Sequence, residues 1–488
     1  MKIAVFADLH HIYGSRIKGL SLHSALETAH GNGVGFVICA GDMLGNGTAD
    51  EARDIVAIFD KAKMPVAFTP GNAELRTPAE AENAARLLKS APLPAGIVLL
   101  DSSTGSGPTE MLDALPAGGN LLLVTHVPPT SWNGDSREAW LAARRRGAIA
   151  LTVAGHLHKD MESDGLRLVR GLDPDKALGG PPSFPVLEDG PDGWRISQTC
   201  VLPGIDPGEW SADFRRAFRE DLGFSTMYDP LGGLDFAIRN NVPNVEVRDA
   251  SWRPEDFRRL REKIGDWRKA GGRILSTHLP ALHFENGECG GIGRLADACR
   301  AALDMGCDRG TLHVPEIKVG EYDANLELVR DAFAKALAPV AGTAFKIGVE
   351  NMHMAPRGET ATERSFGYTP GECQRQVALL RSIGGLDAGY HIDIGHARNN
   401  APFDHPWPVS SWYQLLGAEC NGMHIHQVTM KPDGAIANHK ALIGCFDPLI
   451  SLSSLILARR EGLLPRVPMF LEIRDNLGPD CYLALSRL

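Results

Sequence analysis

The sequence lacks three features that would place it in other classes of protein. Its nine cysteines are scattered over 488 residues without a C-x-x-C pair, which excludes a disulfide framework and predicts reduced, mostly buried thiols in an intracellular protein. It contains no run of about 18 apolar residues, so we expect no membrane span. It also lacks a basic excess, since the net charge is −10. This argues against a nucleic-acid partner, because polyanions are usually met by a basic face.

Further negative features concern location and assembly. Lys2–His10 already carries a candidate metal motif, so we expect no secretory signal peptide and predict a cytoplasmic protein. The basic run Arg144–Arg146 is interpreted as a solvated helix end, since a charge cluster alone is weak support for a binding face. The oligomeric state stays open, with a homo-oligomer among the alternatives.

The length of the chain predicts more than one domain. At 488 residues it exceeds what one ordinary core holds. Residues 171–195 are rich in Gly, Pro and Asp and are interpreted as late loops with a closing pair of strands. We therefore expect a first domain over 1–200, a linker over 201–218 and a second domain over 219–488.

In the first domain, short apolar runs alternate with helical segments. The expected buried strands are Ile3–Ala7, Val34–Cys39, Val66–Thr69, Leu121–Thr125 and Ile149–Ala154, followed by Phe184–Leu187 and Trp194–Ile196. A helix is expected over Thr77–Ser90, where Thr77 and Glu80 form a capping-box pattern with proline at the first helical position. This alternation predicts a layered α/β fold.

The second domain repeats a strand-then-helix rhythm. The clearest strands are Val245–Arg248, Ile274–His278, Gly310–Val314, Lys346–Glu350, Gly389–Ile394, Gly422–His426 and Met469–Ile473. Amphipathic helices are expected over Asp256–Ala270, Leu295–Asp304, Ala324–Ala338 and Pro370–Ser382, the last opened by a second capping box from Thr369 to Glu372. Seven or eight such units in about 250 residues are typical of a (β/α)8 barrel, whose active site faces the carboxyl ends of the strands.

Metal-binding residue types stand at the ends of the apolar runs in the first domain. They are Asp8, His10, Asp42, Asn72, His126, His156 and His158. Asp8 and His10 are two residues apart at a strand end and point the same way, so they can share one ion. Asp42 can bridge two ions, and the remaining residues complete two coordination spheres. Two hard divalent ions about 3.5–4 Å apart clamp a phosphoryl group and generate hydroxide at neutral pH.

The ordered motifs D-x-H, G-D, G-N, a lone His and G-H-x-H resemble those of the calcineurin-like metallophosphoesterases over residues 1–198. The resemblance implies a four-layer α/β sandwich, two divalent ions (Mn, Fe or Zn), and phosphodiesterase or phosphatase activity. One position departs, because the family often has G-N-H, whose His protonates the leaving group, and Ala73 stands here. General acid catalysis typically contributes about 10²–10⁴-fold. The departure predicts a good leaving group or a substitute acid, with His11 and Glu74 as candidates.

A second set of metal-binding residue types ends the strands of the second domain. It comprises His278, His313, Glu350, Asp393, His396, His424, His439 and Glu472. In H-I-D-I-G-H, a glycine turn lets Asp393 and His396 face one metal. The ordered set resembles the xylose-isomerase-like barrel superfamily, which includes sugar epimerases and the endonuclease IV enzymes, over residues 220–488.

That resemblance leaves two chemistries open. In the ketose epimerases, a Glu, Asp, His, Glu quartet holds one Mn²⁺ or Mg²⁺ ion, and its two glutamates exchange a proton across the substrate. The matching quartet is Glu350, Asp393, His424 and Glu472. Endonuclease IV adds ligands for three zinc ions, and the matching extra positions are His278, His313, His396 and His439. Ala437 replaces the aspartate of its last D-x-H, which favours one or two ions. For His391 and His426 we expect roles outside the ligand set.

We therefore expect two metalloenzyme domains in one chain. The first is predicted to hydrolyse a small organophosphate such as a sugar phosphodiester. The barrel is predicted to isomerise or epimerise a related sugar with one to three divalent ions (Mn, Mg or Zn). Two alternatives stay open, namely a barrel that hydrolyses phosphoesters as endonuclease IV does, and a chain in which one domain is a non-catalytic binding module. The expected partner is a small phosphorylated or carbohydrate substrate.

Overall fold

The computed structural model describes residues 1–191, 193–248, 254–353, 362–398, 407–431, 436–447 and 450–488. By its internal contacts the chain divides into two compact units. The first comprises Met1–Glu209 with Ile450–Leu457, and the second comprises Trp210–Leu449 with Ala458–Leu488. Helix α6 (Ala212–Asp221) begins within residues 201–218 and belongs to the second unit. Across the described ranges, we find no helix that has both the length and the apolar character needed to cross a bilayer.

The first unit contains two five-stranded sheets. The order β10-β9-β1-β2-β3 is formed by β1 (Lys2–Phe6), β2 (Phe36–Ala40), β3 (Val66–Thr69), β9 (Ser183–Gly190) and β10 (Gly193–Val201). The order β4-β5-β6-β8-β7 is formed by β4 (Ile97–Leu100), β5 (Leu121–Thr125), β6 (Ile149–Ala154), β7 (Met161–Ser163) and β8 (Leu166–Leu168). Strands β1 to β3 are parallel to one another, as are β4, β5, β6 and β8. The loops after the parallel strands of each sheet therefore leave from one edge.

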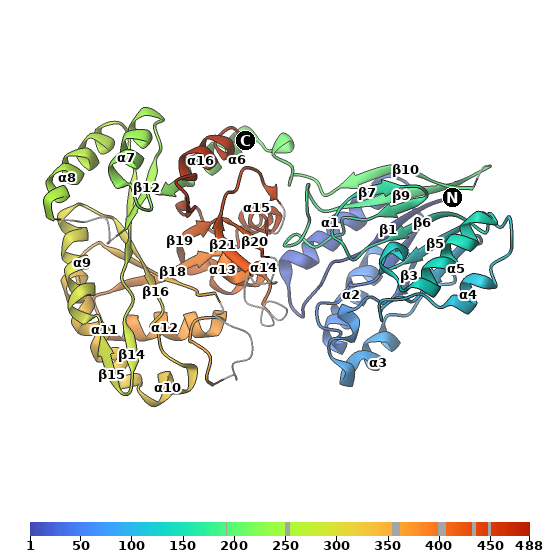
Figure 1. The fold of residues 1–488 in the computed structure, drawn as a ribbon, viewed down its shortest axis with the longest axis horizontal. Helices are drawn as coiled ribbons and strands as arrows, with labels where there is room; N and C mark the ends of the chain where they lie inside the picture. Colours follow the sequence, from blue (N-terminus) through green and yellow to red (C-terminus); the bar gives the residue numbers. More distant parts are fainter. Residues whose placement is uncertain (192, 249–253, 354–361, 399–406, 432–435, 448–449) are drawn as a thin grey trace. The chain divides into compact units, whose positions relative to one another are not determined.

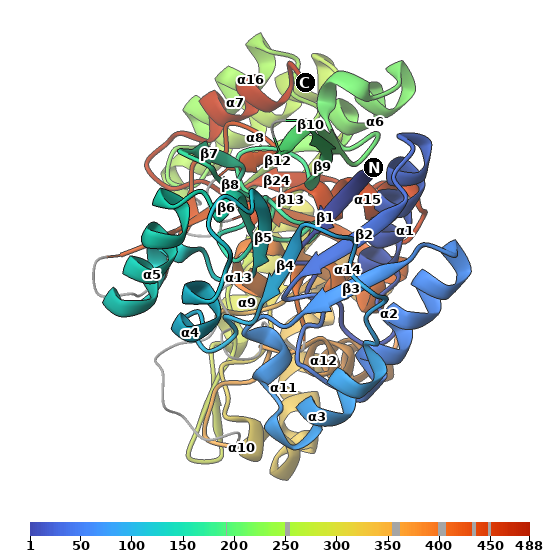
Figure 2. The same cartoon turned by 90° about the vertical axis from the view of Figure 1, so that its right-hand side faces the viewer.

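Apolar side chains from both sheets of the first unit form a shared core. Val5, Ile38, Val124 and Val153 are fully buried members of it. The helices α1 (Arg16–Gly31), α2 (Ala49–Ala62) and α3 (Pro78–Leu87) lie on one side of the two sheets, and α4 (Thr109–Asp113) and α5 (Gly134–Arg145) lie on the other (Figure 2). This order of helix, sheet, sheet and helix confirms the predicted four-layer sandwich.

The second unit is a closed barrel of eight parallel strands (Figure 1). The strands are β11 (Leu222–Ser225), β12 (Asn244–Arg248), β13 (Ile274–Leu279), β16 (Arg309–His313), β17 (Lys346–Glu350), β18 (Asp387–Asp393), β19 (Cys420–Ile425) and β24 (Met469–Leu471). Pairing of β11 with β24 closes it. The helices that follow these strands in the chain are α7 (Pro230–Arg239), α8 (Pro254–Lys269), α9 (Ile292–Asp304), α11 (Leu326–Leu337), α12 (Pro370–Ile383), α14 (Val409–Leu416) and α16 (Gly478–Leu485), together with α15 (Ser453–Arg460), whose residues divide between the two units. The predicted (β/α)8 architecture is confirmed.

Shorter elements occupy the loops between the barrel strands. They are β14 (His283–Glu285), β15 (Glu288–Gly290), α10 (Val319–Ala324), α13 (Ile394–Arg398), β20 (Gln427–Met430), β21 (Ile436–Lys440), β22 (Phe446–Asp447) and β23 (Ile450–Ser451). Strands β20 and β21 form an antiparallel pair. This pair and α13 matter below, because each carries a histidine of the candidate site.

Most predicted strands lie within two residues of their expected bounds. The predicted bounds of β3, β5, β6 and β17 are those observed. Sequence alone did not mark β4, β7, β8 and β11. The apolar run of β4 also fits a buried helix, and the other three strands are only three or four residues long. Tertiary structure, which adds strand partners on both sides of β11, identifies it as a strand.

One predicted helix cap is wrong. The Thr77 side chain caps nothing, and the Glu80 carboxylate instead accepts the backbone N–H of Ala49 at 3.0 Å. The first backbone N–H groups of α2 lack partners within the helix, so they attract the Glu80 carboxylate more strongly than the backbone N–H of Thr77 does. At the second predicted box one half forms: the Thr369 side chain accepts the Glu372 N–H, whereas the Glu372 carboxylate accepts the backbone N–H groups of Gly367 and Tyr368. The reciprocal capping box of the first unit lies at Thr48, which the sequence analysis above leaves without a cap.

Replacing Thr48 by Ala should lower the free energy of unfolding of the first unit by about 1 kcal/mol, because a capping hydrogen bond is lost. Thr77→Ala is the matched control and should change stability little, since the Thr77 side chain makes no cap bond. Urea unfolding of the full-length protein, followed by circular dichroism, measures both. Equal losses in the two variants would contradict the assignment.

Two candidate metal centres

The predicted ligands of the first unit follow the carboxyl ends of its parallel strands. Asp8 and His10 follow β1, Asp42 follows β2, Asn72 follows β3, His126 follows β5, and His156 and His158 follow β6. The aspartates, His10 and His126 are buried, and the remaining three are half-buried. The contacts below join all of these side chains into one network.

Asp42 lies at the centre of this network. Its Oδ2 is 3.1 Å from His10 Nε2, and its Oδ1 is 3.4 Å from His126 Nε2. His126 Nε2 also lies 3.1 Å from Asn72 Oδ1 and 3.3 Å from His156 Nδ1. A carboxylate whose two oxygens face separate imidazoles is placed to bridge two cations.

Asp8 and His158 lie on the His10 side of Asp42. Both oxygens of Asp8 accept the backbone N–H of His156 at 2.9 Å, and its Oδ1 is 3.9 Å from His158 Nε2. The His158 ring stacks on His10, with ring centroids 5.1 Å apart. Two half-sites therefore flank Asp42.

Glycines allow the ligand loops to approach one another closely. A Cβ at Gly71 would lie 2.2 Å from Asp42 Oδ1, and one at Gly155 would lie 2.5 Å from Asp8 Oδ2. Asp8 and Asp42 have φ angles of 50° and 51°, a conformation that costs a residue with a side chain on the order of 1–3 kcal/mol. The surrounding structure holds both aspartates in this strained form, which is typical of functional sites.

The charged side chains of this network are buried, and burial shifts their pKa values. Burial raises the pKa of Asp8 to about 8. Burial would also raise the pKa of Asp42, but hydrogen bonds with His10 and His126 outweigh it and hold that pKa well below its usual value. Burial would lower the pKa of His126, yet the Asp42 carboxylate raises it to about 9. The donor set therefore has a strong demand for positive charge, for which protons and metal ions compete.

The two candidate substitute acids are both engaged elsewhere. The Glu74 carboxylate accepts the backbone N–H groups of Asp42, Leu44 and Gly71 at 2.7–2.9 Å. Burial raises its pKa to about 7. His11 Nε2 lies 3.1 Å from Asp54 Oδ2. Glu74 thus joins the two loops that carry Asp42 and Asn72, and His11 joins its loop to helix α2.

A buried ion pair, which sequence alone did not reveal, supports the site behind His10. The Asp173 carboxylate is fully buried, and its Oδ2 lies 3.4 Å from His10 Nδ1 and 2.9 Å from Lys18 Nζ. Lys18 is only 1% exposed and also lies 3.8 Å from Asp175. His10 Nδ1 makes no hydrogen bond within the described structure, so Asp173 acts on this ring through charge at short range. The available signal was the pair of aspartates beside Lys176 in a stretch interpreted only as loops.

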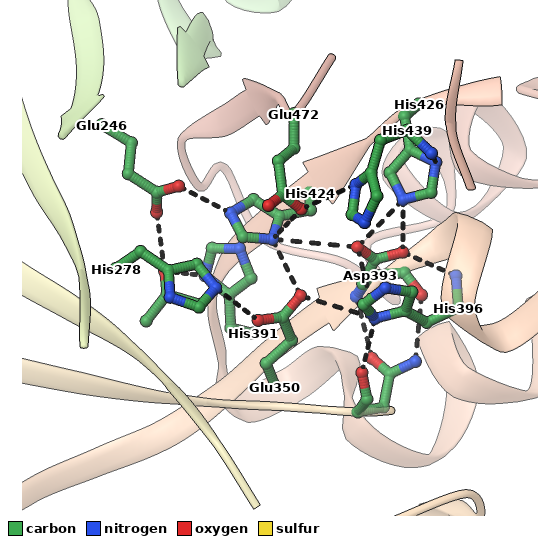
Figure 3. A network of polar contacts seen from close by, with 12 residues as sticks. Glu246, His278, Glu350, His391, Asp393, His396, His424, His426, His439 and Glu472 are labelled. Atoms are coloured by element: carbon green, nitrogen blue, oxygen red, sulfur yellow. Dashed lines mark hydrogen bonds and ion pairs between the residues drawn. The ribbon is translucent and has the colours of Figure 1, made fainter. Parts of the chain in front are cut away.

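The predicted ligands of the second unit line the carboxyl end of the barrel. They lie on or just after β13 (His278), β16 (His313), β17 (Glu350), β18 (Asp393), α13 (His396), β19 (His424), β21 (His439) and β24 (Glu472). All but His313 are buried. Strand register sets Glu350 beside His313 and Asp393 beside His424. Figure 3 shows Glu350, Asp393 and Glu472 turned toward His424.

The predicted quartet forms the first ligand group of the barrel. One ligand atom each from Glu350, Asp393, His424 and Glu472 lies within 4.8 Å of the others. His424 Nδ1 is 2.9 Å from Glu350 Oε1, 3.1 Å from Glu472 Oε2 and 3.8 Å from Asp393 Oδ2. Three carboxylates around one imidazole nitrogen are a donor set for a hard or borderline divalent ion.

A second ligand group shares Glu350 with the first. Glu350 Oε2 lies 3.4 Å from His278 Nε2 and 3.1 Å from His313 Nε2. Within the described structure this oxygen is buried and accepts no hydrogen bond. The two oxygens of Glu350 therefore face two different ligand groups.

A third group consists of three imidazoles, those of His396, His426 and His439. The His439 ring centroid lies 4.5 Å from that of His426 and 5.4 Å from that of His396. His396 Nε2 and His439 Nδ1 are buried and make no hydrogen bond in the described structure. His426 Nε2 is 3.1 Å from Asp393 Oδ1. His426 Nδ1 accepts the backbone N–H of His439 at 3.0 Å, so both ring nitrogens have protein partners, and the expected role of His426 outside the ligand set stays a prediction.

Burial lowers the pKa of three of these imidazoles, those of His278, His396 and His439. It lowers the pKa of His278 to about 4 and that of His439 to about 2. Burial would also lower the pKa of His424, but Glu246 and Glu350 outweigh it and raise that pKa to about 10. Neutral imidazoles offer the lone pairs that metals need, and a metal that binds His424 has to release its proton.

Two residues of β12, unmarked in the sequence, also face this cluster. Glu246 is fully buried, and its Oε1 is 2.9 Å from His424 Nε2. Arg248 forms an ion pair with Glu472. The strand itself was predicted, and its alternation sets both polar residues on one face. That alternation was the signal available in the sequence.

The first unit is similar in sequence to a known protein family. Residues 1–160 match the family model described as calcineurin-like phosphoesterase. They form a calcineurin-like phosphoesterase domain. Every predicted ligand of this domain, from Asp8 to His158, lies inside the matched residues, whereas the supporting Asp173 lies beyond them. Comparison with curated proteins gave no match.

Several solved structures are similar to this chain. Endonuclease IV from Thermus thermophilus has 19% identity over 55% of this chain and 97% of its own, with a TM-score of 0.38. A putative xylose isomerase from Rhodospirillum rubrum has 18% identity over 55% and 96%, with a TM-score of 0.43. D-allulose 3-epimerase from a Methylomonas species has 14% identity over 52% and 83%, with a TM-score of 0.37. These TM-scores are too low to carry an argument, so the barrel assignment rests on its own strand pairing.

Lys18→Met should lower the free energy of unfolding by about 3–5 kcal/mol, because it leaves the buried Asp173 carboxylate without its cation. The double variant Lys18→Met with Asp173→Asn should recover most of this loss. Lys2→Met is the control, since Lys2 pairs with Glu188 at the surface and such pairs contribute about 0–1 kcal/mol. Urea unfolding gives all three values. A Lys18→Met variant as stable as Lys2→Met would contradict the buried pair.

Proposed function

We propose that the first unit hydrolyses a phosphoester bond of a small organophosphate, with a sugar phosphodiester as the expected substrate class. The position of Asp42 supports this most directly. Its two oxygens face His10 at 3.1 Å and His126 at 3.4 Å. A carboxylate so placed holds two divalent ions close enough to clamp one phosphoryl group.

The donors of the first unit fit two ions of Mn, Fe or Zn, because imidazole, carboxylate and amide oxygen ligands suit these metals. The ligands proposed for one ion are Asp8, His10, His158 and Asp42, and those for the other are Asp42, Asn72, His126 and His156. When bound, the ions supply a hydroxide at neutral pH and neutralise phosphoryl charge. The strained backbone and the ion pair behind His10 hold these donors in place before substrate arrives.

The leaving group receives little help from a protein acid in this proposal. The Ala73 side chain has no acidic proton, and the Ala73 backbone N–H already donates a hydrogen bond to Asp42 Oδ1 at 2.7 Å. Glu74 is occupied by three backbone N–H groups, and His11 is paired with Asp54. We infer that the natural substrate has a leaving group that departs as an anion without protein assistance.

Asp42→Asn should lower kcat/KM for bis-p-nitrophenyl phosphate by more than about 10²-fold, since several kcal/mol of charge stabilisation depend on the ions it holds. Asp54→Asn is the control, because Asp54 contacts His11 and no proposed ligand side chain. It should turn over at nearly the wild-type rate. Unchanged turnover of Asp42→Asn would disprove the bridging role.

The missing acid predicts a steep dependence of kcat on the leaving group. Aryl phosphodiesters of decreasing leaving-group acidity should react progressively more slowly, with the same slope in wild type and in His11→Asn. If His11 were the acid, its replacement would selectively slow the poorest leaving groups, by about 10²–10⁴-fold. Steady-state kinetics on a series of substituted phenyl esters distinguishes the two outcomes.

For the second unit we propose metal-dependent hydrolysis of a phosphoester, whereas the sequence favoured isomerisation. The support is again a shared carboxylate, since Glu350 Oε1 faces His424 while Oε2 faces His278 and His313. A carboxylate committed to two ions is not free to exchange a proton with carbon. Sugar isomerisation or epimerisation is the second candidate, favoured by the quartet that includes Glu350 and Glu472.

Metal content separates the two candidates for the barrel. A full-length Asp42→Asn, His156→Ala variant should lose the ions of the first unit and keep those of the second. We expect two or three ions per chain in this variant, measured by inductively coupled plasma mass spectrometry on protein never exposed to chelators. A single ion would favour the isomerase, and none would refute a metal site in the barrel.

A further inference from the structure

We propose that Glu246 is the positioning residue that fixes His424 for metal binding in the barrel. The inference rests on the proposed metal site of the second unit. It adds a side chain that belongs to none of the three ligand groups there. Glu246 lies on β12, whereas His424 lies on β19, and the two residues are 178 positions apart in the chain.

The Glu246 carboxylate is fully buried and fully engaged. Its Oε2 accepts the hydroxyls of Ser276 at 3.1 Å and Thr311 at 2.8 Å. Its Oε1 lies 2.9 Å from His424 Nε2. All four side chains are 0% exposed. Two hydroxyl donors from neighbouring strands therefore aim one oxygen of this carboxylate at the imidazole.

The contact with Glu246 keeps a proton on Nε2 of His424 and leaves Nδ1 as the nitrogen for an ion. An ionised carboxylate can only accept hydrogen bonds, so Nε2 must donate to Glu246. Nδ1 lies 2.9 Å from Glu350 and 3.1 Å from Glu472, so it is the nitrogen whose proton an ion would displace. The opposite tautomer would present an N–H to the ion and could not bind it.

The position of Glu246 excludes a role as a further ligand of the quartet. Figure 3 shows Glu246 and Asp393 on opposite sides of the His424 ring. The His391 ring packs against His424 with centroids 4.2 Å apart, and His391 Nδ1 lies 3.3 Å from Thr311 Oγ1. The imidazole is thus held at one nitrogen and along its face, while its other nitrogen faces the ligand group.

Cobalt binding to the full-length protein tests this role. The parent carries Asp42→Asn and His156→Ala, so that Co²⁺ at the first unit does not contribute, and is stripped with a chelator before titration. Visible absorption follows Co²⁺ coordination. Glu246→Gln should bind Co²⁺ about 10–100-fold more weakly, as is typical when the partner of a ligand histidine is removed. The melting temperature of the metal-free variant should stay within a few degrees of the parent.

A milder variant and a matched control complete the test. Thr311→Val keeps the carboxylate but removes one donor, and should weaken Co²⁺ binding about 2–10-fold, the effect of one hydrogen bond. This variant decides the question if Glu246→Gln does not fold. Tyr322→Phe removes a buried hydrogen bond to Gln376, 3.0 Å long, in the same unit, and should leave Co²⁺ affinity unchanged.

The outcomes separate this inference from the proposed function. A parent that binds no Co²⁺ would refute the metal site itself. A parent that binds Co²⁺ with the same affinity as Glu246→Gln and Thr311→Val would overturn the positioning role alone. A lower melting temperature without any loss of affinity would show that Glu246 only stabilises the barrel, and would also overturn it.

Discussion

Burial of carboxylates and imidazoles at the carboxyl ends of parallel strands is the constraint on which both units depend. Removing such groups from water is costly unless each finds a partner of opposite charge or a hydrogen bond. The ligands of the first unit follow strands of two sheets and those of the second follow strands of one closed barrel, yet in both units acidic and imidazole side chains gather at the carboxyl ends of the strands. Asp42 and Glu350 show the result most clearly, because each divides its oxygens between separate groups of imidazoles. A bound cation can be the shared partner of all these carboxylate oxygens and imidazole nitrogens at once.

The sequence predicted the parts of each site that are encoded locally. An apolar run followed by D-x-H, or by His and Asp around a glycine turn, identifies both the strand and the residues that follow it. Asp173 and Glu246 were missed because their role depends on partners far along the chain, at Lys18 and His424. The cap predicted at Thr77 failed for a related reason, since tertiary structure gave Glu80 a different helix end to bind.

The two supporting carboxylates solve one problem with different charge balances. Asp173 lies behind His10 and has the buried ammonium of Lys18 as its counterion. Glu246 lies behind His424 and is satisfied by the hydroxyls of Ser276 and Thr311, which add no charge. The positive charge that faces Glu246 is that of the His424 imidazole, whose pKa Glu246 and Glu350 raise to about 10. A metal ion that binds His424 replaces one proton of this imidazole, so the charge balance at Glu246 depends on that proton or on the ion that displaces it.

The chemistry of the barrel turns on whether His278 and His313 hold an ion of their own. Burial lowers the pKa of His278 to about 4, so its ring is neutral near pH 7 and its lone pair is available. If His278 and His313 held an ion, both oxygens of Glu350 would be engaged by cations, and such a pair of ions could bind a substrate phosphate. Without it, the same glutamate keeps one oxygen free to exchange a proton with a sugar carbon. The proposed hydrolysis and the alternative isomerisation therefore differ in whether this one pair of histidines holds an ion.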